Sequence, residues 1–170
     1  MRLGKHLLWI TQYYTDADEP GDDRQRIHVE AMLEAGFRVT VLTAQVRHLD
    51  RRLFGKKRLF RTTKQGALRI VRTYATPGYG TFGSRLRNYL SFAALAFLYG
   101  LFRAGRVDAV FASSPSLFAG AAGAAIAALR RVPFVLEVRD LWPESAVALG
   151  FLEHPVPIAM SRWLERALYR

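Results

Sequence analysis

The stretch VPFVLEVRDLWPES, residues 132–145, places charged residues directly after an apolar segment. Its unbroken apolar run, Phe134–Leu136, predicts a buried β-strand. In open α/β sheets, ligands bind outside the carboxyl ends of the strands, which is where Arg139 and Asp140 would lie. This one stretch therefore predicts both an α/β fold and a candidate site.

The same residues also fit a plain strand-to-helix turn. In that interpretation Pro143 is the first helical residue, Glu144 stabilises the helix N-terminus, and Trp142 simply packs. Composition alone does not separate the two interpretations, so both remain open at this point.

The rest of the chain alternates short apolar strands with helices. Between Ser113 and Arg130, Ser114 is expected to cap a helix that Pro115 opens, and its Ala-rich and Gly-rich sequence would let it lie close to a sheet. This order predicts an α/β fold with a Rossmann-like parallel sheet and helices on both faces. Strands are expected at residues 7–10, 37–43, 67–76, 107–113 and 133–138, and helices at 22–35, 83–103, 115–130 and 156–170.

Length and composition limit the classes of protein that this chain fits. Its 170 residues suit a single domain, here residues 1–170, with enough chain for a real core. The absence of cysteine excludes disulfides and thiolate metal sites, and a cytoplasmic location is the default expectation. Residues 1–10 have too short an apolar run for a signal peptide and are expected to form the first strand.

The net charge of +11 is concentrated in one segment. A basic loop at residues 47–64 holds eight Lys or Arg and one acid, whereas residues 16–23 hold five acids. Those acids would repel a phosphate backbone, so the charge does not by itself indicate nucleic-acid binding.

Two segments are candidates for contact with an anionic membrane surface. The basic loop interleaves Leu and Phe with its cations, and the helix at residues 85–103 is apolar nearly all round with arginines at both ends. Its apolar part, about 21 Å long, is too short to span a bilayer, and a buried core helix would show the same pattern. The expected membrane contacts are Arg51, Arg52, Phe54, Lys56, Lys57, Arg58, Phe60, Arg85 and Arg87.

Four segments together resemble the N-terminal domain of retaining family-4 glycosyltransferases with the GT-B fold. They are the first strand with its acidic loop and the helix that follows, residues 36–43, residues 107–115 and residues 132–145. The resemblance runs over nearly all of the chain and is closest to the subgroup that builds bacterial O-antigen, capsule and exopolysaccharide repeat units. It implies that this chain forms the acceptor-binding half of such an enzyme.

In that family a second domain holds the nucleotide-sugar donor and carries two glutamates separated by seven residues. No such pair occurs in this sequence. The resemblance therefore implies that a C-terminal donor domain or a donor-binding subunit is a necessary partner, and that this chain alone is inactive. The nucleotide-sugar would be a co-substrate, no cofactor or metal is expected, and the acceptor would be a polyprenyl-phosphate-linked sugar.

The resemblance also assigns roles to individual residues. Many relatives carry a histidine that contacts the transferred sugar where this chain has Arg139, which cannot act as a base and would serve as a charge clamp. Asp140 would orient or deprotonate the acceptor, the plain alternative being a structural ion pair. The loop holding Asp22 would lie against the donor phosphates, although the carboxylate of Asp22 or Asp23 suits a helix cap equally well. Expected substrate contacts are Pro20, Gly21, Asp22, Ser114, Trp142 and Glu144.

The hypothesis is thus the acceptor-binding half of a glycosyltransferase of cell-surface polysaccharide biosynthesis, peripheral on the inner face of the cell membrane. One alternative is a non-catalytic membrane-associated subunit of a split glycosyltransferase. The least favoured is a basic nucleic-acid-binding domain, which interleaved aromatic residues would also suit.

Overall fold

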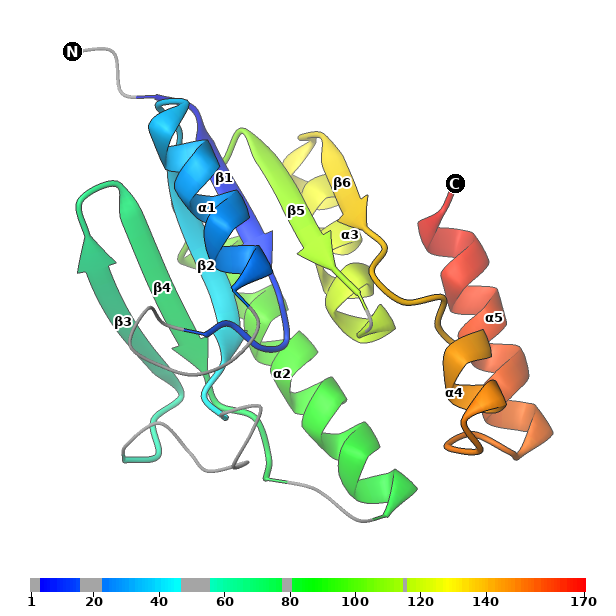
Figure 1. Cartoon of the computed structure of the whole chain (residues 1–170). Coiled ribbons are helices and arrows are strands. Elements are labelled where there is room, and N and C mark those ends of the chain that lie inside the picture. The colour runs from blue at the N-terminus through cyan, green and yellow to red at the C-terminus, as the bar shows by residue number, and fades with distance from the viewer. Residues whose placement is uncertain (1–3, 16–22, 47–55, 78–80, 115) are drawn as a thin grey trace.

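A computed structural model describes residues 4–15, 23–46, 56–77, 81–114 and 116–170. They form one six-stranded sheet with helices on both faces (Figure 1). The strands are β1 (His6–Ile10), β2 (Arg38–Ala44), β3 (Phe60–Gln65), β4 (Leu68–Thr73), β5 (Ala109–Ser113) and β6 (Phe134–Glu137). The helices are α1 (Arg24–Glu34), α2 (Phe82–Phe102), α3 (Leu117–Arg130), α4 (Glu144–Ala148) and α5 (Pro155–Leu168).

The strand order is β3-β4-β2-β1-β5-β6, and every neighbouring pair is parallel except the antiparallel pair β3 and β4. The predicted Rossmann-like parallel sheet is therefore confirmed. Its parallel strands point toward the same end of the molecule, and their carboxyl ends lie together there (Figure 1).

The larger core lies between the sheet and the pair of helices α2 and α3. Helix α3 comes close to the sheet at Gly123, where a Cβ would lie 3.0 Å from the Phe134 ring. The two helices approach each other at Gly100, where a Cβ would lie 2.5 Å from Cδ1 of Ile126. The small residues predicted to allow close packing do so on this face.

The opposite face is only partly covered. Helix α1 packs its Val29 against Trp9, Val39 and Val41 of β1 and β2, while β5 and β6 lie beyond this helix (Figure 1). Val135, on this side of β6, is 41% exposed. The expectation that β6 is a buried strand is therefore wrong for the described chain, because β6 is the last strand of its sheet and one face is open.

The predicted basic loop ends earlier than expected. Residues 60–65 form the edge strand β3, which pairs with β4 through a turn at Gly66, where φ is +58°. This pairing sets Arg61 opposite Arg72 and Lys64 opposite Arg69. All five polar side chains of β3 are exposed, and only its first residue, Phe60, packs against the main core.

Two predicted helix caps are also corrected. Helix α3 begins two residues later than expected, and its capping side chain is Ser116, whose Oγ accepts a hydrogen bond from the Ala119 N–H at 3.3 Å. Pro115 lies outside the described residues. Asp23 occupies the cap position of α1, but its carboxylate pairs with Arg26 at 3.1 Å and caps no N–H.

Helix α2 has one core face and one apolar outer face. It buries Asn88, Phe92, Ala96 and Tyr99, and it exposes Phe82, Leu90, Leu98 and Phe102. The two interpretations of this helix, core or surface, thus each describe one of its sides. Among the helices of the described residues, none is both long and apolar enough to cross a membrane.

Candidate functional site

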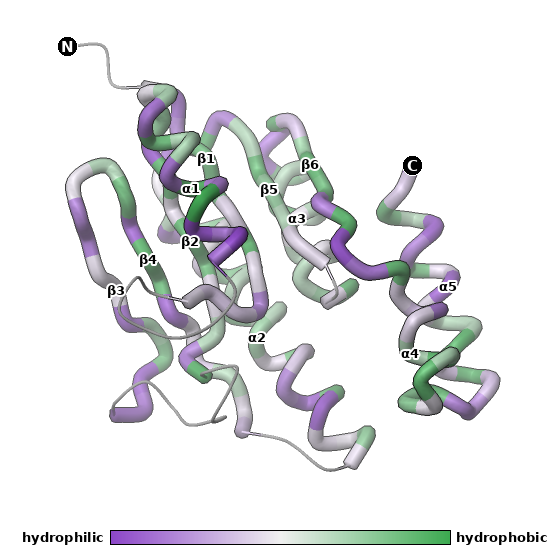
Figure 2. The backbone as a smooth tube through the Cα atoms, viewed as in Figure 1, coloured by the Kyte–Doolittle hydropathy of each residue, from purple (hydrophilic) through white to green (hydrophobic). Residues whose placement is uncertain are grey.

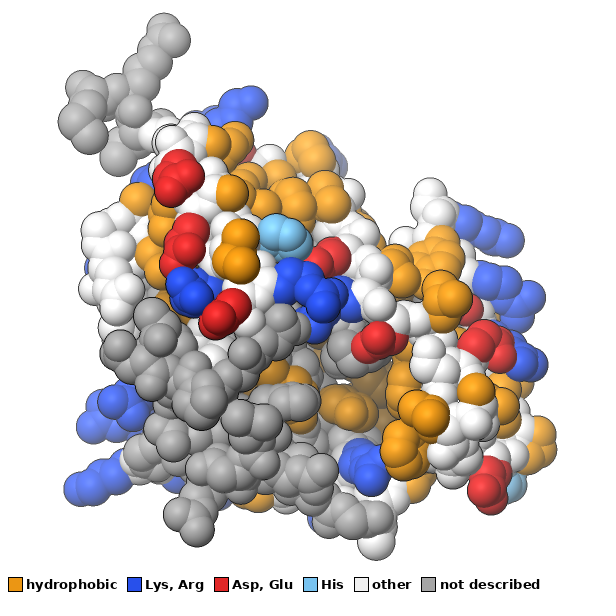
Figure 3. All heavy atoms as spheres, in the orientation of Figure 1, with side chains coloured by type: hydrophobic (Ala, Val, Ile, Leu, Met, Phe, Trp, Pro, Cys, Tyr) orange, Lys and Arg blue, Asp and Glu red, His pale blue; other side chains and the backbone are white. Residues whose placement is uncertain are grey.

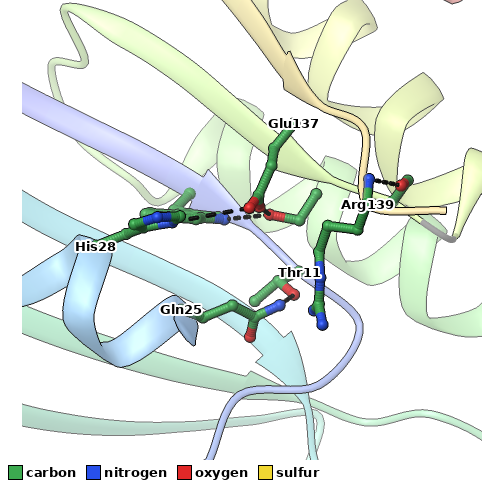
Figure 4. Close-up of polar contacts among 8 residues, drawn as sticks. Thr11, Gln25, His28, Glu137 and Arg139 are labelled. Atoms are coloured by element: carbon green, nitrogen blue, oxygen red, sulfur yellow. Dashed lines mark hydrogen bonds and ion pairs between the residues drawn. The ribbon is translucent and has the colours of Figure 1, made fainter. Parts of the chain in front are cut away.

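Polar side chains converge where β1, β5 and β6 end, beside the first turns of α1 (Figure 4). In Figure 2 the apolar β6 gives way to a hydrophilic loop at this point. Each strand contributes a polar group at or just after its last residue, and α1 contributes two more. The residues are Thr11, Gln25, His28, Ser113, Ser114, Glu137 and Arg139.

Glu137 is held in place by a chain of two hydrogen bonds that starts at the buried Trp9 indole. Trp9 is 3% exposed, and its Nε1 donates to Oγ of Ser113 at 2.8 Å. The Ser113 hydroxyl in turn donates to Oε2 of Glu137 at 2.5 Å. A hydrogen bond to a carboxylate is stronger than one between neutral groups, so the carboxylate has a defined position.

The other carboxylate oxygen of Glu137 faces α1. Its Oε1 lies 3.7 Å from Nδ1 of His28, and the two side chains point toward one another (Figure 4). The His28 ring also stacks on the Trp9 indole, with ring centres 5.8 Å apart and an interplanar angle of 20°. The imidazole is therefore oriented by two neighbours from different strands.

Ser114 binds the backbone of the loop that follows β6. Its Oγ accepts a hydrogen bond from the Arg139 N–H at 2.7 Å and a longer one from the Asp140 N–H at 3.4 Å. Its own N–H donates to the Glu137 carbonyl at 2.9 Å. The predicted substrate contact Ser114 is buried and positions the two residues on which the site prediction rests.

The Arg139 side chain runs toward α1 and the end of β1 (Figure 4). With its amide oxygen turned toward the guanidinium, Gln25 accepts from Nη1 of Arg139 at 3.0 Å and from Oγ1 of Thr11 at 2.7 Å. Asp140, the next residue, is exposed. A fixed cation and an accessible carboxylate therefore stand side by side at the carboxyl edge of the sheet.

Charged side chains of both signs lie next to a histidine on this face (Figure 3). Such an arrangement can bind hydroxyl groups through carboxylates and an anion through the guanidinium. Within the described ranges, no three His, Asp or Glu side chains converge as a set of metal ligands.

The remaining predicted substrate residues are placed differently. Glu144, the first residue of α4, accepts two hydrogen bonds from Arg162 of α5, at 2.8 and 3.0 Å. This contact lowers the pKa of the Glu144 carboxyl below its ordinary value. Trp142 is half-buried in the loop before α4, and Pro20, Gly21 and Asp22 lie outside the described residues.

The predicted membrane-contact residues differ in their surroundings. Arg51, Arg52 and Phe54 lie outside the described residues, whereas Lys56, Lys57 and Arg58 are exposed just before β3. Phe60 does not extend to solvent as expected, because its ring packs against Tyr99 with ring centres 5.2 Å apart. At the start of α2, Arg87 is exposed and Arg85 lies over the Phe151 ring, 5.5 Å from its centre.

A pocket of about 460 Å³ lies between the start of α2 and the connection from α4 to α5. Both elements are at the end of the molecule toward which the parallel strands point (Figure 1). Aromatic and aliphatic side chains form most of the pocket, with two polar residues among them. The lining residues are Phe82, Gly150, Phe151, Leu152, Glu153, His154 and Pro157.

Sequence reasoning did not single out His28, Gln25, Ser113 or Glu137 as site residues. A carboxylate at the end of an apolar run was a usable signal for Glu137, because a strand end is where sites form. His28 carried no such signal, since only the folded chain shows which side of α1 faces β6.

A family model described as a glycosyl transferase 4-like domain matches residues 26–170. The match begins within α1 and includes β2 to β6, with His28, Ser114, Glu137, Arg139 and Asp140. No curated protein matches the chain significantly.

Proposed function

Because the chain belongs to the glycosyl transferase 4-like family, we propose that it binds the sugar acceptor in a transfer from a nucleotide-sugar donor. The proposed product is part of a cell-surface polysaccharide such as an O-antigen, capsule or exopolysaccharide, and the proposed stereochemical course is retaining. The observation that carries this proposal is the position of Arg139 and the exposed Asp140, two consecutive residues, at the carboxyl ends of the strands.

Each of the two residues has a role that its position supports. The Arg139 guanidinium, fixed by Gln25, would stabilise negative charge that develops on the leaving diphosphate. The exposed Asp140 carboxylate would accept a hydrogen bond from a hydroxyl group of the acceptor and so orient it.

A lipid-linked acceptor, carried on polyprenyl phosphate, suits the apolar surfaces near this edge. The pocket beside Phe82 and Phe151 could receive an apolar chain, and Arg85 beside it supplies a cation. We propose that the donor is held by a further domain or by a separate donor-binding subunit. The nucleotide-sugar would be a co-substrate, and no metal or other cofactor enters the proposal.

We propose that the protein works on the inner face of the cell membrane. Residues 56–76 hold seven Lys or Arg and no acid, and all but Arg69 and Arg72 of these cations are exposed. Each such cation near an anionic lipid surface contributes about 1 kcal/mol to binding.

Transfer activity tests the proposal directly. The chain, together with its donor-binding domain or subunit, is incubated with candidate nucleotide-sugars and a lipid-linked acceptor. We expect Asp140→Asn to lower turnover strongly, whereas Asp108→Asn, at the opposite edge of the sheet, should leave it near the wild-type value. Transfer from none of the donors would overturn the proposed function, and unchanged turnover of Asp140→Asn would remove Asp140 from the site.

A further inference from the structure

His28 and Glu137 form an imidazole–carboxylate pair beside the Arg139–Asp140 segment. The Nδ1 atom of His28 lies 3.7 Å from Oε1 of Glu137, within ion-pair range but longer than a hydrogen bond. Such contacts in unliganded sites often shorten when substrate binds. The pair brings together α1 and β6, which are far apart in the sequence.

Both members of the pair are held in place by residues of the sheet. Glu137 Oε2 accepts the Ser113 hydroxyl, which itself accepts the Trp9 N–H, so the carboxylate keeps one oxygen for His28. The Trp9 indole also supports the face of the imidazole. Trp9 thus contacts His28 directly and is linked to Glu137 by the Ser113 hydroxyl.

The outer nitrogen of His28 is available to a ligand. The side chain is 47% exposed, and no hydrogen bond to Nε2 occurs within the part of the chain that the structure describes. A carboxylate opposite Nδ1 favours the tautomer with its proton on Nδ1, which leaves Nε2 as an acceptor. An imidazole oriented in this way by a carboxylate is the arrangement of a general base.

The pair lies at the carboxyl ends of the strands, as the candidate site does. Gln25, which contacts Arg139, precedes His28 by one turn of α1. Arg139 and Glu137 are two residues apart, and in Figure 4 Glu137 lies between His28 and Arg139. A bound hydroxyl at this edge could therefore reach Nε2.

We propose that His28 accepts the proton of the attacking acceptor hydroxyl and that Glu137 positions it. This inference rests on the proposed function. The hydroxyl oxygen forms a bond to the anomeric carbon of the donor sugar on the face from which the diphosphate oxygen departs, as the proposed retaining course requires, and the bond from that carbon to the diphosphate oxygen breaks. The electron pair leaves with the nucleoside diphosphate, and the proton passes to Nε2, where Glu137 stabilises the resulting imidazolium.

His28→Ala tests the role of the imidazole in the same transfer assay. We expect kcat to fall about 100-fold or more, with KM for the acceptor little changed, because the imidazole acts on the transition state. Added imidazole should restore part of kcat in His28→Ala and none in Asp140→Asn. The matched control is Glu30→Gln, which removes a carboxylate from the same helix and should keep the wild-type kcat.

Glu137→Gln tests the positioning role separately. It should lower kcat less than His28→Ala, and Glu137→Asp should recover part of the loss. Because the two residues act as a unit, the double variant His28→Ala/Glu137→Gln should be no slower than His28→Ala alone. Losses that multiply in the double variant would overturn the pairing of the two residues.

The outcomes separate this inference from the proposed function. If the wild-type protein transfers sugar and folded His28→Ala does so with unchanged kcat, His28 is not the proton acceptor. A raised KM with unchanged kcat would also overturn the inference, because it would show a binding role only. If the wild-type protein transfers nothing, the proposed function itself has failed.

Discussion

Ser114 and Arg139 are joined by a hydrogen bond of 2.7 Å from the Arg139 backbone N–H to the Ser114 hydroxyl. Ser114 directly follows the last residue of β5 and is 6% exposed. One buried hydroxyl therefore sets the direction in which the loop after β6 leaves the sheet, and with it the positions of Arg139 and Asp140.

Replacing this hydroxyl should destabilise the fold and loosen the site. Ser114→Ala leaves two backbone N–H groups without their partner, and an unsatisfied buried donor costs about 1–3 kcal/mol. We expect the free energy of unfolding, measured in urea, to fall by about that amount. Ser145→Ala, which removes an exposed hydroxyl bonded to Leu141, should change it far less. Equal effects of the two variants would contradict the structural role of Ser114.

The contact between α2 and α3 should tolerate no side chain at Gly100. A Cβ there would lie 2.5 Å from Ile126 and 3.3 Å from Leu8, so Gly100→Val should lower the thermal midpoint, with a cost of about 1–3 kcal/mol from overpacking. The control is Gly83→Ala in the same helix, where nothing lies within 4 Å of the added Cβ. That control should raise stability slightly, because alanine favours a helix over glycine.

Stability should decrease as the pH falls below about 6.5. Burial, as the main cause, lowers the pKa of His6 from its ordinary value, while its Nδ1 and Nε2 contact the Arg106 carbonyl and the Thr40 hydroxyl. The unfolded chain then binds a proton at a pH where the folded chain does not. The stabilisation is complete above the pKa that His6 has in the unfolded chain. As the pH drops from there toward the lower pKa of His6 in the folded chain, the free energy of unfolding falls by at most about 1.4 kcal/mol per pH unit for one proton.

Urea unfolding between pH 8 and pH 5.5 measures this dependence. His6→Gln should flatten the curve in that range, whereas His154→Asn, at the exposed cap of α5, should leave it unchanged. A curve for His6→Gln that parallels the wild type would assign the dependence to other groups.

The basic hairpin of β3 and β4 should bind anionic vesicles. Arg61→Glu/Lys64→Glu removes two exposed cations, which at about 1 kcal/mol each should weaken binding roughly thirtyfold or more. Lys5→Glu/Arg106→Glu, which lies outside the hairpin just before β1 and β5, is the control with the same change of charge. If the hairpin variant loses RNA binding while its vesicle binding is unchanged, this surface recognises nucleic acid instead.

The central fold could be predicted because its strands are apolar runs that pair with their neighbours. Strands β1 and β2 are buried along nearly their whole length and β5 along most of it, and their apolar sequences show it. Strand β3 could not be recognised, since FRTTKQ is exposed at nearly every position and resembles a charged loop. Its existence depends on pairing with β4, which is a non-local interaction.

The candidate site was predictable only where it follows one strand. Arg139 and Asp140 stand directly after an apolar run, whereas Gln25 and His28 reach the site because α1 packs across β1. Ser114 followed by Pro115 resembled a helix start, but the folded chain uses Ser116 as the cap and leaves Ser114 to bind the loop. Two serines in competing positions cannot be distinguished by local preference alone.

The alternation of side chains along β6 limits which changes in chain length this protein could accept. Phe134 and Leu136 face α3, while Val135 and Glu137 face the open side. Deleting one residue within the strand would exchange the two sets and direct Glu137 into the apolar layer. Insertions and deletions are therefore compatible with the site only outside β6.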